Sequence, residues 1–117
     1  MYFKSDYHEE TARELMKRFG FEKLEDDREY GTFCYVTTAT YKYEDLKKVA
    51  DSEGLDLDKL QQIMLVYSST EISMIRFGLQ LFNANIDDIT IPDVMSGLDD
   101  ENKRVVIEAL KFRYRIR

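Results

Sequence analysis

Residues that interrupt regular structure are scarce in this chain, whose 117 residues include one proline and five glycines. Turn-rich β folds need proline and glycine at their many turns, so this scarcity favours a mainly helical protein. There is also only one cysteine, Cys34, which excludes an internal disulfide. A lone cysteine is typical of proteins that work in a reducing compartment.

Long hydrophobic runs are absent as well. The longest uncharged apolar run, at 63–67, is too short to cross a bilayer, and the first ten residues contain no signal-peptide core. We therefore expect a complete cytoplasmic chain with no membrane partner. Its length fits one helical domain that covers residues 1–117.

The net charge of −6 is unevenly distributed. Residues 103–117 contain six basic residues and one acidic residue, so this segment carries +5 and the rest of the chain carries −11. An acidic body disfavours general binding to nucleic acid. The basic end nevertheless makes a nucleic-acid-binding regulator the alternative function, with Lys111, Arg113, Arg115 and Arg117 as candidate residues. Cations in a last helical turn also have a purely structural use, because they offset the helix dipole.

Polar capping residues and apolar spacing predict helices along most of the chain. Ser68-x-x-Glu71 is a capping-box pattern, and Pro92 suits the first turn of a short helix. The other predicted helices lie at 6–19 with a cap at Ser5 or Asp6, at 43–54, around 60–64 after Asp56 or Asp58, and from Asp99 or Asp100 to Tyr114. We expect a mainly α, compact single-domain bundle of five to six helices.

The segment 28–41 has two interpretations. Its threonines, tyrosines and valine favour a strand, and a short hairpin here is the alternative to a fully helical fold. Apolar residues also recur at spacings of three and four, with Asp26 or Asp27 as a cap, which favours a helix. No second strand-like segment is long enough to pair with this one, so the context favours the helix.

The segment 69–83 predicts a helix that is apolar around most of its circumference. Its polar side chains fall on one strip, formed by Ser69, Ser73, Arg76, Gln80 and Asn83. A helix of this kind is expected at the centre of the fold, with the first and last helices packed against it.

Two residues of this predicted helix have specific roles. Gly78 lies in the apolar arc, where it allows a neighbouring helix to approach closely. Arg76 is expected to face water or an acidic loop such as Asp87–Asp88 or Asp99–Asp100. A third interpretation makes Arg76 and the nearby Gln80 contacts for a protein partner.

The segments "YFKSDYHEE", "SSTEISMIRFGLQLFN" and "DVMSGLDDENKRVVIEALKFRY" together span much of the chain. In combination they resemble a family of uncharacterised small helical proteins of Bacillota and their phages and mobile elements. The resemblance implies a mostly helical fold and favours a helix at 28–41. It implies no assigned activity and supplies no catalytic residues.

Catalytic and metal-binding patterns are weak. His8 is the only histidine, and we expect it on the surface in a first helical turn. Cys34 is expected to be a small buried residue, because no activating partner is evident. The aspartate pairs lack the spacing of a calcium loop. We predict no catalytic residue, metal or cofactor, and a small enzyme with an unrecognised carboxylate site is the second alternative.

Tyrosines are the remaining interaction candidates. Tyr30, Tyr35, Tyr41 and Tyr43 cluster in the sequence, and tyrosine is enriched at protein interfaces. They can equally surround the core and direct their hydroxyls to water. We expect a non-enzymatic regulatory or interaction protein, encoded by a phage or mobile element, that binds a host or defence protein. A homodimer is left open.

Overall fold

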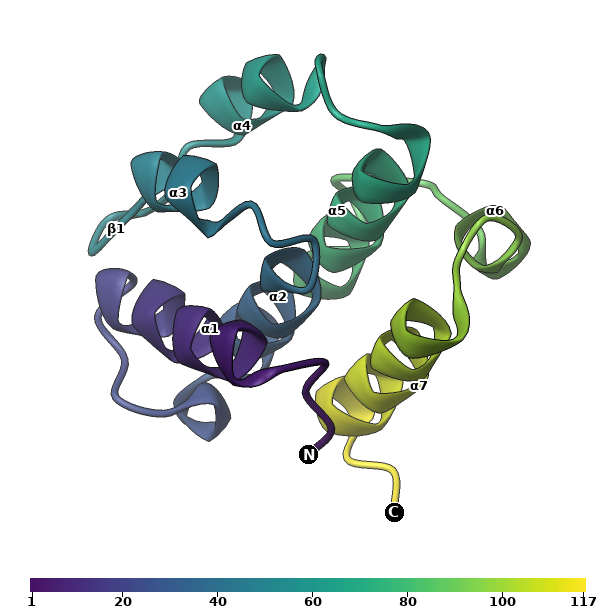
Figure 1. Ribbon diagram of the computed structural model, residues 1–117. Helices are drawn as coiled ribbons and strands as arrows, with labels where there is room; N and C mark the ends of the chain where they lie inside the picture. The colour runs from purple at the N-terminus through teal and green to yellow at the C-terminus, as the bar shows by residue number, and fades with distance from the viewer.

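Six of the seven α-helices in the computed structural model, which describes residues 1–117, start at a short polar side chain that accepts a hydrogen bond from the first turn. These caps are Ser5, Asp27, Asp56, Ser68, Thr90 and Asp99. The helices are α1 (Asp6–Arg18), α2 (Arg28–Thr38), α3 (Tyr43–Leu46), α4 (Leu57–Met64), α5 (Ser69–Phe82), α6 (Ile91–Met95) and α7 (Asp100–Tyr114), shown in Figure 1. The predicted mainly α fold is confirmed, with one helix more than the expected range.

The only sheet is a hairpin of β1 (Ala50–Asp51) and β2 (Gly54–Leu55), in which Ala50 pairs with Leu55. The predicted helix at 43–54 is therefore wrong over its second half. After α3 and a 3₁₀ turn, η2 (Lys47–Val49), the Asp51 carboxylate accepts a bond from the Glu53 N–H at 2.8 Å. The helical backbone has already ended at Val49, and Gly54, with a positive φ of 121°, closes the turn of the hairpin.

The ambiguous segment 28–41 forms α2, so the strand alternative for it is wrong. Its threonines are compatible with a buried helix, because each hydroxyl donates a hydrogen bond to a backbone carbonyl. The hydroxyls of Thr32, Thr37 and Thr38 donate to the carbonyls four residues earlier at 2.6 to 2.7 Å. Every residue from Gly31 to Thr38 is buried, so α2 is surrounded by other elements.

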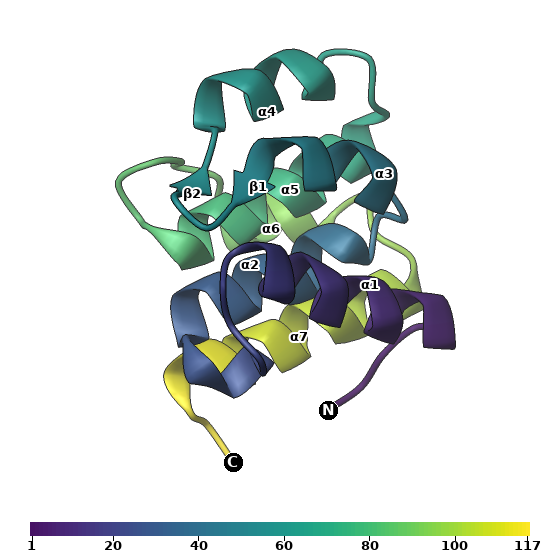
Figure 2. The same ribbon diagram turned by 90° about the vertical axis from the view of Figure 1, so that its left-hand side faces the viewer.

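Helix α2 is the centre of the fold, which corrects the prediction that 69–83 is central. Helices α1, α5 and α7 each make their most extensive helix contacts with α2, and Figures 1 and 2 show α2 between α1 and the pair α5 and α7. Two apolar clusters meet at α2: Phe33 and Cys34 face the cluster shared with α1, and Tyr35 and Val36 face the one shared with α7. The apolar surface of α5 is covered largely by this neighbour.

Two glycines permit the close helix packing around α2. A Cβ on Gly78 of α5 would lie 3.0 Å from Cγ2 of Thr37, so the predicted close approach at Gly78 is confirmed. A Cβ on Gly31 would lie only 2.2 Å from the carbonyl oxygen of Leu24, in the 3₁₀ turn η1 (Leu24–Asp26). This second contact is with a backbone oxygen, so no side-chain rotation can relieve it.

His8 is buried, and the prediction of a surface histidine is therefore wrong. Its Nε2 lies 2.7 Å from the carbonyl oxygen of Tyr35, and its Nδ1 accepts the backbone N–H of Lys4 at 3.1 Å. The ring also packs against Phe3 and Tyr35. An accepting Nδ1 requires the proton on Nε2, so the imidazole is neutral and joins the N-terminal segment to α2.

This histidine makes stability pH-dependent. Burial lowers the pKa of His8 below its ordinary value of 6.5, although the hydrogen bond to Tyr35 opposes the shift. His8 therefore binds a proton more readily in the unfolded chain than in the folded chain. The free energy of unfolding should fall as the pH drops below about 6.5. Urea unfolding between pH 7.5 and 5.5 measures the effect.

His8→Phe provides the control for this pH dependence. Because His8 is the only histidine, the variant should unfold with an almost constant midpoint across the same pH range. It should be less stable than the parent at pH 7.5, since the N–H of Lys4 and the carbonyl of Tyr35 lose a partner. A parent protein with a constant midpoint would contradict the neutral assignment.

Candidate functional site

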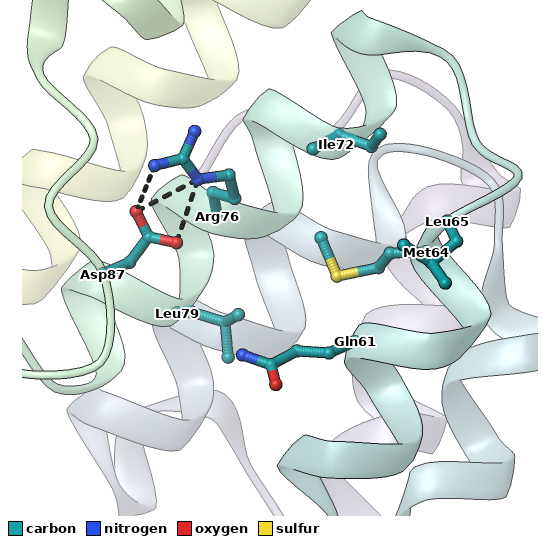
Figure 3. A pocket seen from close by; sticks show the side chains of 7 residues that line it. All are labelled: Gln61, Met64, Leu65, Ile72, Arg76, Leu79 and Asp87. Atoms are coloured by element: carbon teal, nitrogen blue, oxygen red, sulfur yellow. Dashed lines mark hydrogen bonds and ion pairs between the residues drawn. The ribbon is translucent and has the colours of Figure 1, made fainter.

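A cavity of about 280 Å³ lies between α4 and α5. Its walls come from both helices and from the loop 83–90, and Figure 3 shows Met64 and Gln61 facing Arg76 and Leu79 across it. We call this surface the α4–α5 groove. Its lining consists of Gln61, Met64, Leu65, Ile72, Arg76, Leu79 and Asp87.

Two exposed aliphatic side chains lie in the turn after α4, and the first of them, Leu65, lines the groove. Leu65 is 80% exposed and Val66 is 88% exposed, the highest values among the large hydrophobic residues that lie at the surface. They lie at the tip of the turn between α4 and α5. The turn is closed by the Tyr67 N–H, which donates to the Met64 carbonyl at 3.0 Å, and the Tyr67 hydroxyl donates to the Asp45 carboxylate. Both flanking residues are anchored, so the two between them point outward.

Sequence reasoning missed Leu65 and Val66, although a signal was present. The apolar run at 63–67 ends directly before the cap at Ser68. When so few residues connect two helices, they form a tight turn at the surface. Their side chains are then exposed whether they are polar or apolar. An aliphatic pair at such a position is a candidate contact surface.

Arg76 lies at the other side of the groove and pairs with the acidic loop, so the prediction of an internal carboxylate partner is confirmed. Its Nε donates to both Asp87 carboxylate oxygens at 3.0 and 3.1 Å, and its Nη2 lies 3.0 Å from Oδ1 of the same residue. The hydrogen bond to Asp87 raises the pKa of Arg76 further, so the guanidinium is always charged. Gln80 adds a bond from Nε2 to the Asp87 carbonyl at 3.2 Å.

Asp87 therefore organises the loop 83–90. Its Oδ1 also accepts the Ile89 N–H at 2.9 Å, and its side chain is only 13% exposed. The next residue differs, because the Asp88 side chain is fully exposed and reaches Arg76 Nη2 only at 3.3 Å. Arg76 and Gln80 thus hold the loop in place, while Asp88 remains available to a partner.

Acidic side chains extend the groove at both ends. Beyond Gln61 and Leu65, a shallower hollow is lined by Asp58, and beyond Asp87 another is lined by Asp88. The first hollow shares Gln61 and Leu65 with the central cavity and the second shares Asp87, so each adjoins it. The cavity is mainly apolar, and the adjoining hollows carry Asp58 and the Asp87–Asp88 pair.

The candidate tyrosines do not form one surface. Tyr35 is fully buried and its hydroxyl donates to the Tyr2 carbonyl, so Tyr35 is corrected to a core residue. Tyr30 packs against Phe82 at the start of α2. Tyr41 is exposed beyond the opposite end of α2, and Tyr43 is partly buried at the start of α3. Tyrosines that are neighbours in the sequence are thus distributed over α2, the turn that follows it and α3.

The basic candidates divide into two groups. Lys111, Arg115 and Arg117 line a hollow of about 340 Å³ at the end of α7, together with Arg28, which the sequence analysis missed. We call this the basic hollow. Arg113 lies elsewhere, because its Nε donates to the Leu81 carbonyl at 2.8 Å and its Nη2 lies 3.6 Å from Glu29. It is a structural residue, which removes it from the predicted nucleic-acid surface.

The single thiol of the chain has no activating neighbour. Cys34 is buried, as expected, and burial raises the pKa of its thiol well above the usual value. Its Sγ lies 3.9 Å from Sδ of Met16, which is not a base. No group of three or more His, Cys, Asp or Glu side chains is arranged to hold a metal ion. No helix has both the length and the apolar composition to span a bilayer.

Comparison of the chain with protein-family models, with curated proteins and with solved structures found no match.

Proposed function

We propose that this protein is a non-enzymatic protein-binding module whose contact surface is the α4–α5 groove. The observation that supports this is the exposed Leu65–Val66 pair beside an open apolar cavity of about 280 Å³. Exposed aliphatic side chains next to a hollow gain free energy when a partner covers them. The role expected from the sequence, regulation of a host or defence protein in the cytoplasm by a phage- or mobile-element protein, is part of this proposal.

The partner that fits the groove is a basic amphipathic segment of another protein. Apolar side chains of that segment would enter the cavity between Met64, Ile72 and Leu79, as in other helix-in-groove complexes. Lysines or arginines on either side of them would reach Asp58 and Asp88 at the two ends. Arg76 does not oppose this, because Asp87 already neutralises it.

Two synthetic amphipathic helical peptides test the proposal. Both carry leucine at the same apolar positions, and their charged positions are lysine in one peptide and glutamate in the other. The lysine peptide should bind, as measured by fluorescence anisotropy, and the glutamate peptide should not. Leu65→Ser should weaken binding about tenfold, since it removes an exposed apolar side chain that lines the groove. Asp88→Asn should weaken it less and reduce its dependence on salt.

Ile107→Ser is the matched control, because Ile107 is also an exposed aliphatic residue but lies on α7. It should leave peptide binding unchanged. Equal binding of both peptides would contradict the charge complementarity. Absence of binding by the lysine peptide, or an equal loss in Ile107→Ser and Leu65→Ser, would contradict the groove as the contact surface.

A further inference from the structure

The basic hollow lies at the other end of the molecule from the α4–α5 groove. Figures 1 and 2 both show α4 at one end and the end of α7 at the other. Four cationic side chains line the hollow, Arg28, Lys111, Arg115 and Arg117, against the single carboxylate of Glu108. This concentration of positive charge is unusual in a chain with 23 acidic and 17 basic residues.

Arg28 is held in a fixed position at the edge of the hollow. Its Nη1 donates to the Phe112 carbonyl at 3.0 Å, and its guanidinium lies 4.5 Å from the centre of the Phe112 ring. Its Nε is buried and has no hydrogen-bond partner. Because the contacts with Phe112 fix the guanidinium in advance, it loses little further side-chain entropy when it binds an anion.

The arginines of the hollow lack carboxylate partners, as do Arg18 and Arg104 elsewhere in the chain. Arg13 and Arg76, by contrast, each have a carboxylate oxygen within 3.0 Å. Arg28, Arg115 and Arg117 form no ion pair, and Lys111 has only Glu108, at 3.7 Å. Their mutual repulsion is therefore not relieved within the chain, and a bound anion would relieve it.

The backbone at the end of α7 brings the last cations to the hollow. Arg115 adopts a left-handed conformation with φ 58° and ψ 39°. The following N–H, of Ile116, then donates to the Lys111 carbonyl at 2.9 Å, which turns the chain back over the end of the helix. This turn places Arg115 and Arg117 beside Arg28 rather than along the continued helix axis.

We infer that the basic hollow binds a small anion that carries phosphate groups. Guanidinium groups bind phosphate through paired, charge-assisted hydrogen bonds, and Arg28 and Arg115 approach the hollow from different elements. The volume suits a small molecule. A nucleic-acid strand fits less well, because beyond the hollow it would run along a body of net negative charge.

Titration calorimetry on the whole chain at low salt tests this inference, with inorganic phosphate, pyrophosphate and ADP as separate probes. Pyrophosphate should bind more tightly than phosphate, since it engages more of the cations. ADP distinguishes a nucleotide ligand from an inorganic one. Arg115→Asn and Lys111→Gln should each weaken pyrophosphate binding about tenfold, the typical value of one charge-assisted hydrogen bond.

The variants separate binding from folding. Asparagine tolerates the left-handed conformation, so Arg115→Asn removes the charge and keeps the turn. Lys103→Gln is the control, because Lys103 lies about two turns earlier on the same helix, makes no ion pair and is remote from the hollow. It changes the net charge equally and should leave pyrophosphate binding almost unchanged.

Three outcomes would overturn the inference. The first is that none of the three phosphate probes binds. The second is an equal loss of binding in Lys103→Gln and Arg115→Asn, which would show a general charge effect instead of a site. The third is tighter binding of a single-stranded 12-nucleotide DNA than of pyrophosphate, which would favour the nucleic-acid alternative.

Discussion

Gly31→Ala should destabilise the protein by about 3 kcal/mol, because it overpacks a contact between two backbones. The added Cβ would lie 2.2 Å from the Leu24 carbonyl oxygen and 3.1 Å from Cε1 of Phe112. Relief requires η1 to move away from α2, and this movement would uncover Leu24, which is buried in the core. Urea unfolding followed by circular dichroism at 222 nm, a wavelength that reports helix, measures the loss.

Gly97→Ala is the control for this prediction. The nearest atom to a Cβ on Gly97 is Oγ1 of Thr70 at 4.0 Å, and its φ is not positive. The substitution should therefore leave the unfolding midpoint close to that of the parent. A similar loss in both variants would indicate that glycine flexibility, and not the contact with Leu24, determines the effect.

Asp87→Ala has the second largest expected effect, a loss of about 2 to 3 kcal/mol. The carboxylate accepts bonds from Arg76 and from the Ile89 N–H, so its removal leaves a partly buried guanidinium and a backbone N–H without their acceptor. The loop 83–90 should then detach from α5. Urea unfolding gives the stability, and amide hydrogen exchange at Ile89 reports the loop.

The neighbouring Asp88→Ala provides the comparison. It removes the same charge from the same loop, but the Asp88 side chain is fully exposed and makes one long bond to Arg76. Its unfolding midpoint should match that of the parent. An equal loss in the two variants would mean that the local charge, and not the hydrogen bonds of Asp87, stabilises the loop.

Local sequence signals predicted the helix starts well because a cap depends on a few adjacent residues. The box Ser68-x-x-Glu71 forms as expected, with the Ser68 N–H on the Glu71 carboxylate at 2.9 Å. A helix within 28–41 was also predicted, from the spacing of its apolar residues, the absence of a partner strand and the family resemblance. Its propensities favour a strand, and the burial of α2 among other helices overrides them.

Features that depend on distant residues could not be read from the sequence. His8 looks exposed in the pattern of α1, yet the Tyr35 carbonyl 27 positions later accepts its Nε2–H. The prediction that 69–83 is the central helix was also wrong. An apolar circumference indicates that a helix is covered on most sides, but it does not indicate which helix lies at the centre of the fold. The hairpin at 50–55 has too few residues to show alternation.

The candidate sites follow the same rule: contacts between residues close in the sequence were predictable, and contacts between distant residues were not. The pairing of Arg76 with an acidic loop was one of the alternatives that the sequence left open, beside exposure to water, and the structure selects Asp87. Lys111, Arg115 and Arg117 were predicted only as candidates of a basic chain end, and not as the lining of a hollow. Arg28 joins them from 84 positions away, through the Phe112 carbonyl, and no local pattern indicates that contact.

The threonine-rich central helix also has a consequence for how the chain folds. A segment with weak helix propensity does not form a stable helix alone, and α2 gains its stability only when α1, α5 and α7 cover it. The hydroxyls of Thr37 and Thr38 are satisfied within that covered helix. We therefore expect α2 to form as the other three helices dock and not before them. Folding should consequently be cooperative, because α1, α5 and α7 each pack against a helix that is stable only when they cover it.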